Sequence, residues 1–112
     1  MMITKVRETH ITDTPHKVDV RKIYDRDNAQ EVHITLKPRE ALKPHITPVD
    51  VFFYVLEGTP EVLVGDERVT TEADNLIESP RGIPYCLYNN SESLARILVV
   101  KAPKPVQQSR LL

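Results

Sequence analysis

The chain has 112 residues, of which 40% are hydrophobic and 28% charged, with a formal net charge of −1. These values predict one soluble globular domain and give no electrostatic case for binding nucleic acid or an anionic membrane. A single cysteine, Cys86, excludes an internal disulfide framework and a cysteine-rich zinc site. No apolar run approaches the roughly 20 residues that span a bilayer, and the polar N-terminus does not resemble a signal peptide, so we expect a cytoplasmic protein.

The first half of the chain predicts short strands separated by turn residues. Residues 17–24 form the first candidate strand, and 25–29 are a cluster of turn formers. Residues 31–37 alternate, which places His33, Thr35 and Lys37 on the face opposite the apolar side chains. Residues 49–57 form the strongest candidate strand and contain both phenylalanines.

The second half continues the same pattern. Residues 61–70 predict a hairpin, in which Gly65 followed by Asp66 suits a type II′ turn. Further strands are expected at residues 75–78, 85–88 and 95–101, and residues 102–112 are expected to form an irregular arm. No window has a sustained helical period, and nine prolines oppose long helices.

These elements predict an all-β protein with a sandwich, jelly-roll or barrel architecture. We expect one domain, in which an N-terminal arm and first strand (1–29) and a C-terminal tail (103–112) flank a core (30–102). Residues 52–56 and 97–100 are apolar on both faces, although a strand with one face in water should alternate. A second subunit covering the outer face would explain this, so we predict a homodimer; the alternative is that loops or the terminal arms cover it.

Two segments contain spaced motifs. Residues 38–58 read PREALKPHITPVDVFFYVLEG, and residues 74–89 read DNLIESPRGIPYCLYN. Both resemble the signature motifs of the cupin superfamily over roughly residues 30–102. The first family motif is G-x5-H-x-H-x(3,4)-E-x6-G. Here His45 and Gly58 match, whereas Arg39, Thr47 and Val51 stand in place of the first glycine, the second histidine and the glutamate.

The second family motif is P-x-G-x2-H-x3-N. Pro80, Gly82 and Asn89 match it, and Tyr85 stands in place of the histidine. The resemblance implies a double-stranded β-helix, or jelly-roll barrel, of the small single-domain type. It also implies a metal site of three histidines and a glutamate, of which this chain keeps only His45.

The remaining side chains are poor metal ligands. A threonine hydroxyl binds divalent ions weakly, valine has no donor atom, and tyrosine binds well only as a phenolate, whose ordinary pKa is about 10. We therefore expect no cofactor, with a weakly bound divalent metal as the alternative. His33 could supply a second imidazole beside His45 if both faces of its strand are buried; otherwise it is a surface or interface histidine.

Strand alternation places Tyr85, Leu87 and Asn89 on one face, which would meet His45, Thr47, Val51, Phe53 and Val55 inside the barrel. The expected result is an apolar pocket with a few polar groups, typical of small-molecule sites. The alternative is that these side chains simply fill the barrel. Cys86 should point to the other face as a buried, inert thiol.

Three functions remain open. The first is binding of a small polar or anionic molecule, with Arg81 and Lys43 as candidate cations near the mouth. The second is an enzyme, such as a metal-independent isomerase or epimerase using His45 as base and Tyr85 as acid, with Asp74 or Glu78 as an added carboxylate. The third is a structural dimer with a filled barrel. We assign no role to His10 and His16, which lie in the N-terminal arm without a motif.

Overall fold

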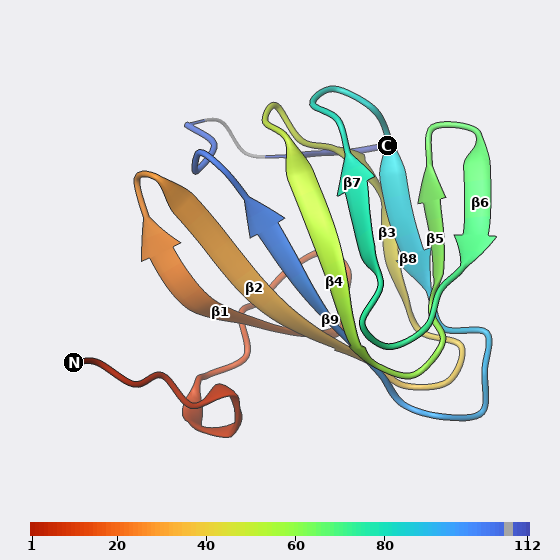
Figure 1. Cartoon of the computed structure of the whole chain (residues 1–112), viewed down its shortest axis with the longest axis horizontal. Helices are drawn as coiled ribbons and strands as arrows, with labels where there is room; N and C mark the ends of the chain where they lie inside the picture. Colours follow the sequence, from red (N-terminus) through yellow and green to blue (C-terminus); the bar gives the residue numbers. More distant parts are fainter. Residues whose placement is uncertain (107–108) are drawn as a thin grey trace.

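The computed structural model describes residues 1–106 and 109–112 and consists of two five-stranded antiparallel sheets packed face to face (Figure 1). The first sheet has the order β1-β2-β9-β4-β7, formed by β1 (Asp19–Arg26), β2 (Ala29–Leu36), β9 (Ala95–Lys101), β4 (Val51–Glu57) and β7 (Leu76–Ser79). The second has the order β10-β3-β8-β5-β6, formed by β10 (Arg110–Leu111), β3 (Ala41–Ile46), β8 (Tyr85–Tyr88), β5 (Glu61–Val64) and β6 (Glu67–Thr70). The one helical segment in the described residues is a 3-10 turn, η1 (Val6–Glu8). The predicted all-β fold is confirmed.

The core lies between the two sheets and follows the alternation of the strands. On β4, Val51, Phe53 and Val55 are buried, and on β9 Ile97 and Val99 point to the same side. The residues between them face outward and are half-buried. Burying each large apolar side chain contributes about 1.5–3 kcal/mol, which is the main stabilisation of a domain of this size.

Most predicted strands lie within two residues of the observed ones, and residues 85–88 and 95–101 coincide with β8 and β9. In the β5–β6 hairpin Gly65 has φ 61° and Asp66 is not in the positive-φ region, as a type II′ turn requires. Strand β3 was not predicted, because residues 41–46 contain a proline and a lysine and do not alternate.

The prediction of an irregular arm after residue 102 is wrong at its end. Arg110 and Leu111 pair with Ile46 and His45 as strand β10. The part of that prediction at residues 107–108 lies outside the described residues. The N-terminal arm is also fixed to the sheet, since the Thr12 N–H donates to the Val20 carbonyl and the Arg21 guanidinium donates to the Val6 carbonyl.

Two positions of the first motif have left-handed backbone. Gly58 has φ 83°, and a Cβ there would lie 2.4 Å from the Leu94 carbonyl oxygen. Arg39 has φ 71°, a conformation that costs an L-residue about 1–2 kcal/mol and explains why glycine suits this position. No helix in the described residues is long and apolar enough to span a membrane.

Candidate functional site

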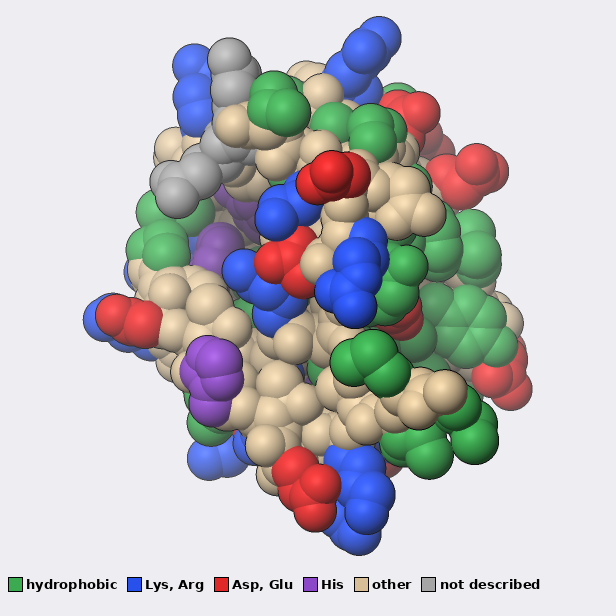
Figure 2. All heavy atoms as spheres, turned by 90° about the vertical axis from the view of Figure 1, so that its left-hand side faces the viewer, with side chains coloured by type: hydrophobic (Ala, Val, Ile, Leu, Met, Phe, Trp, Pro, Cys, Tyr) green, Lys and Arg blue, Asp and Glu red, His purple; other side chains and the backbone are tan. Residues whose placement is uncertain are grey.

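A cavity of about 450 Å³ opens between the two sheets on the side of β1 and β10. The N-terminal arm and the C-terminal tail form its rim. On the face seen in Figure 2, histidine side chains lie recessed beside lysine and arginine side chains. The walls combine apolar, cationic, imidazole and hydroxyl groups, from Thr12, Asp13, Thr14, Pro15, His16, Val20, Lys22, Gln30, Val32, Ile34, Leu42, His45, Tyr85, Val99, Lys101, Lys104, Pro105, Val106, Ser109 and Leu111.

Only two of the predicted site residues, His45 and Tyr85, line this cavity. The other predicted pocket residues do not line it and are buried in the core: Thr47, Val51, Phe53, Val55, Leu87 and Asn89. The rings of Phe53 and Tyr85 pack with centroids 5.0 Å apart and occupy the barrel centre. The open volume therefore lies to one side of the position that the motifs predicted.

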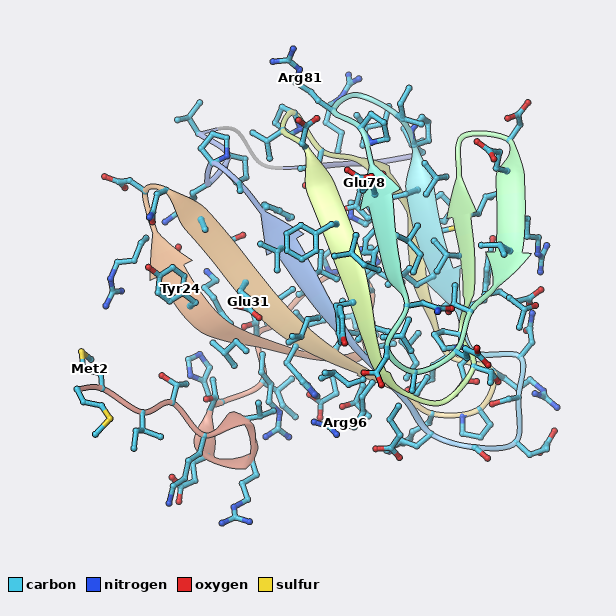
Figure 3. The ribbon with its side chains drawn as sticks, viewed as in Figure 1. Met2, Tyr24, Glu31, Glu78, Arg81 and Arg96 are labelled. Atoms are coloured by element: carbon cyan, nitrogen blue, oxygen red, sulfur yellow. The ribbon has the colours of Figure 1, made fainter. Side chains whose placement is uncertain are left out.

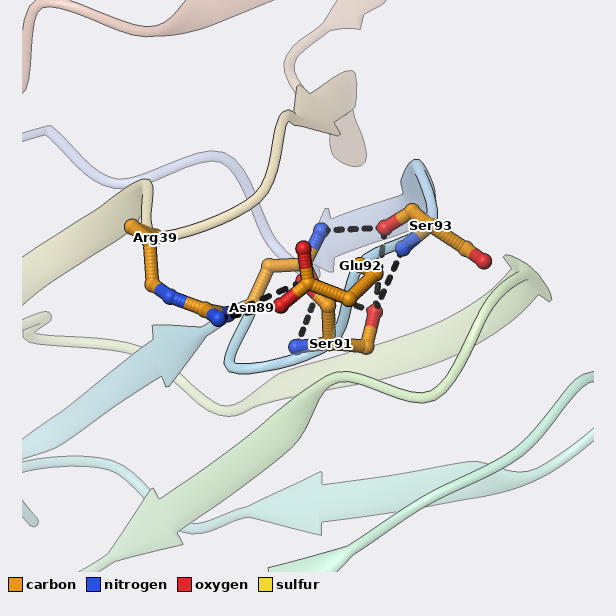
Figure 4. Close-up of polar contacts among 5 residues, drawn as sticks. All are labelled: Arg39, Asn89, Ser91, Glu92 and Ser93. Atoms are coloured by element: carbon orange, nitrogen blue, oxygen red, sulfur yellow. Dashed lines mark hydrogen bonds and ion pairs between the residues drawn. The ribbon is translucent and has the colours of Figure 1, made fainter.

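Asn89 has a structural role. Its side-chain amide donates to the carbonyls of Leu36 and Ser93, and its oxygen accepts from the backbone N–H and hydroxyl of Ser91 (Figure 4). Arg39 extends this network by contacting the Ser91 carbonyl and the Glu92 carboxylate. The network ties the β8–β9 connection to the end of β2, and none of its residues lines the cavity.

A chain of polar contacts runs from the cavity into the core. The Lys101 ammonium lies 3.4 Å from Ser109 Oγ, which lies 2.7 Å from Thr47 Oγ1, which in turn lies 2.9 Å from the Tyr85 hydroxyl. Burial raises the pKa of Tyr85 to about 12, so its hydroxyl keeps its proton. Thr47 is therefore hydrogen-bonded both to the Tyr85 hydroxyl and to Ser109 of the C-terminal tail.

Two imidazoles face the cavity next to Tyr85. The His45 ring centroid is 4.3 Å from that of Tyr85 and 5.0 Å from that of His16. Both histidines bond to the backbone of Lys43. The Lys43 N–H donates to His16 Nδ1 at 2.9 Å, and His45 Nδ1 lies 2.8 Å from the Lys43 carbonyl oxygen.

Burial and nearby lysines disfavour the charged forms of His16, His45 and Lys101. Burial, then the neighbouring His45, Lys43 and Lys101, lower the pKa of His16 to about 4. Burial also lowers the pKa of His45, although its bond to the Lys43 carbonyl opposes this. Burial, followed by repulsion from Lys22, lowers the pKa of Lys101.

His33 does not join His45. It lies on the outer face of β2, between Val32 and Ile34, which line the cavity. Its Nε2 accepts from Arg96 Nε at 3.1 Å, and its buried Nδ1 has no partner in the described residues. The hypothesis of a site shared by His33 and His45 is wrong, because alternation along β2 turns His33 to the outer face of its sheet, whereas His45, on β3 of the other sheet, lines the cavity.

The other candidates near the mouth also lie elsewhere. Arg81 extends from the β7–β8 turn away from the body of the protein, and Glu78 lies on β7, so neither lines the cavity (Figure 3). Asp74 accepts a hydrogen bond from the Tyr54 hydroxyl. Lys43 contributes its backbone, while its side chain is exposed. Cys86 is fully buried, as predicted.

The residues do not fit the metal implied by the resemblance. In the described part of the chain no three His, Cys, Asp or Glu side chains come together. The other motif positions hold Val51, which has no donor atom, Thr47, whose hydroxyl is bonded to Tyr85 and Ser109, and Tyr85, whose phenol keeps its proton. The lysines on the cavity wall would also repel a divalent cation.

Residues 32–101 match the family model described as a cupin domain. The chain belongs to the cupin family. A search of curated proteins finds no significant match.

Solved structures give the same fold. The cupin is similar to TT1209 from Thermus thermophilus, with 29% identity over 94% of this chain and 100% of that chain, at a TM-score of 0.81. The polyketide cyclase RemF from Streptomyces resistomycificus is 21% identical over 100% of this chain and 85% of that chain, at a TM-score of 0.84. An RmlC-like cupin from Methanocaldococcus jannaschii, described as a double-stranded β-helix, is 21% identical over 92% of this chain and 94% of that chain, at a TM-score of 0.73.

Sequence reasoning missed several groups of this site. His16, Lys22 and Lys101 belong to no motif, and no short-range pattern connects them with His45. The alternation of β9 does put Lys101 on the same face as Ile97 and Val99, and a lysine in register with core residues was an available signal.

Proposed function

We propose that this cupin binds a small anionic molecule in the cavity beside His45, without the metal that its family motifs imply. The observation that supports this best is the environment of Lys101. Its side chain lies on the core side of β9, and within the described residues it has a hydroxyl, Ser109, but no carboxylate as partner. A partly buried ammonium without a counter-charge is a natural anchor for a ligand anion.

Two further lysines add to the positive potential around Lys101. Lys22 and Lys104 also line the cavity and share the carboxylate of Asp25, at 3.8 and 2.8 Å. Among the described residues that line the cavity there is one acidic side chain, Asp13, and there are three lysines. The volume of about 450 Å³ is within the range of small-molecule sites, and its apolar wall suits a short carbon skeleton.

The second candidate is an isomerase or epimerase that uses His45 and Tyr85. The two rings line the same cavity with centroids 4.3 Å apart. The Tyr85 hydroxyl is already hydrogen-bonded to Thr47, and burial raises its pKa to about 12, which makes it a weak acid. The likeness to the polyketide cyclase, at 21% identity, supports the fold alone.

Anion binding is tested by isothermal titration calorimetry with phosphate, pyruvate and malonate. Loss of a charge-assisted hydrogen bond costs about 1.5–3 kcal/mol, so Lys101→Met should weaken binding by about 10- to 100-fold. Lys43→Met removes an exposed lysine outside the cavity and should change the affinity by less than about 3-fold. The same preparations, purified without chelator or affinity tag, should contain far less than one metal ion per chain by elemental analysis.

Equal binding by the parent and Lys101→Met, or no binding of any of these anions, would refute the proposal. Near-stoichiometric metal would refute its metal-independent part.

A further inference from the structure

His16 and His45 are held in opposite tautomers by one residue. A backbone N–H can only donate, so His16 Nδ1, which the Lys43 N–H reaches, is the unprotonated nitrogen. A carbonyl oxygen can only accept, so His45 Nδ1 bears the proton that it gives to Lys43. In the neutral rings, His45 therefore has its lone pair on Nε2, and His16 has its proton on Nε2.

The neutral form of both rings is favoured, because burial and nearby cations, Lys101 among them, lower the pKa of each. The cavity thus presents a base, His45 Nε2, and a hydrogen-bond donor, His16 Nε2–H, on rings whose centroids are 5.0 Å apart. Lys101 lines the same volume and interacts with both imidazoles. A base, a neutral donor and a fixed cation together match the needs of proton abstraction next to a carbonyl group.

We propose that this cavity catalyses proton transfer at the carbon next to the carbonyl of a small 2-oxo acid. The inference rests on the proposed function, since Lys101 would hold the carboxylate. His45 Nε2 removes the proton from C3. The C–H electron pair forms a C=C bond while the carbonyl π pair moves onto oxygen, where the His16 Nε2–H bond stabilises the enolate. Return of a proton from His45 re-forms the C–H bond, so no oxidant, reductant or leaving group is needed.

The charges favour this substrate class. An enolised 2-oxo acid has two negative charges, and the cavity wall holds Lys22, Lys101 and Lys104 near them. The bound anion would raise the pKa of His45 by opposite-charge attraction and so make it a stronger base in the complex than in the free protein. His16 stabilises the enolate by its hydrogen bond and keeps its proton throughout.

The test is exchange of the C3 protons of pyruvate and 2-oxobutanoate with D₂O, followed by proton NMR in a buffer without imidazole. The parent protein should accelerate exchange above the buffer rate. His45→Gln should lower the catalysed rate by about 100-fold or more, the usual contribution of a general base, with the dissociation constant of pyruvate changed by less than about 3-fold. His16→Gln keeps an N–H donor and should retain more activity than His16→Phe, which lacks one.

The outcomes separate the catalytic inference from the proposed function. Pyruvate binding without accelerated exchange, or exchange that persists in His45→Gln, overturns the catalytic inference and leaves anion binding intact. Binding of phosphate and malonate but not of either 2-oxo acid overturns the substrate class. Failure of every anion to bind overturns the proposed function as well. Loss of both binding and exchange in Lys101→Met supports both.

Discussion

Tyr85 stands where the second cupin motif has a histidine, and its ring contacts both His45 and Phe53. Thr47, which replaces another metal ligand, binds the Tyr85 hydroxyl and Ser109 of the tail. These two replacements are compatible, because each buried hydroxyl has the other as its hydrogen-bond partner. The side chains at these positions serve packing and the attachment of the tail instead of metal coordination.

Acidification should destabilise the free protein through its histidines. The pKa of His16 in the fold, about 4, is below its ordinary value of 6.5, so the neutral ring stabilises the fold fully above pH 6.5 and this stabilisation is lost as pH falls towards 4. After allowance for its partial exposure we expect a loss of about 1–2 kcal/mol from His16. The groups facing it are Lys43, Lys101 and His45, with Asp13, Lys22 and Lys104 on the same cavity.

Urea denaturation across this pH range measures the effect. His16→Gln can still accept from the Lys43 N–H and should flatten the profile, whereas substitution of the exposed His10 by glutamine should leave it unchanged. Identical slopes in the parent and His16→Gln would contradict the assignment.

At the scale of elements, the connection after β4 depends on Gly58. Its φ of 83° and the nearby Leu94 carbonyl oxygen leave no room for a side chain, because a Cβ would lie 2.4 Å from that oxygen. The backbone of the β4–β5 connection therefore packs directly against the start of β9. Strand β3 shows a similar long-range dependence, since it pairs with β8 on one side and with β10 of the tail on the other.

Gly58→Ala should lower the free energy of unfolding by about 3 kcal/mol or more, from backbone strain and the clash together. Gly82→Ala is the matched control: its φ is 77°, but nothing lies within 4 Å of the added Cβ, so only the strain of about 1–2 kcal/mol applies. Chemical denaturation of both variants checks this, and equal losses would show that the contact with Leu94 does not matter.

At the scale of the whole molecule, the outer face of the β1-β2-β9-β4-β7 sheet is partly apolar. Phe52 and Tyr54 of β4 and Leu98 and Val100 of β9 point outward and are half-buried in the single chain. Tyr24 and Glu31 lie on the same face of β1 and β2 (Figure 3). We propose that a second copy of the chain covers this face, as the doubly apolar strands predict.

Val100→Lys tests the dimer. Lysine at this position would face Glu31 across the ladder, so the monomer should stay folded, while a charge inside the interface should dissociate the pair. Light scattering coupled to gel filtration should give a dimeric mass for the parent and a monomeric mass for the variant. Val69→Lys, on the exposed strand β6, should remain dimeric. A monomeric parent would rule the proposal out.

The sequence by itself determined most of the strands, though not β3 or β10, together with the hairpin turn at Gly65 and the cupin motifs, because alternation and turn chemistry act between near neighbours in the chain. It also placed His45 and Tyr85 on one interior face. Only the tertiary structure decided that His16 approaches His45, that Lys101 enters the same cavity, that His33 faces outward and that the tail pairs with β3. Alternation fixes the face of a strand on which a side chain lies, but the meeting of distant segments depends on how the sheets and arms pack.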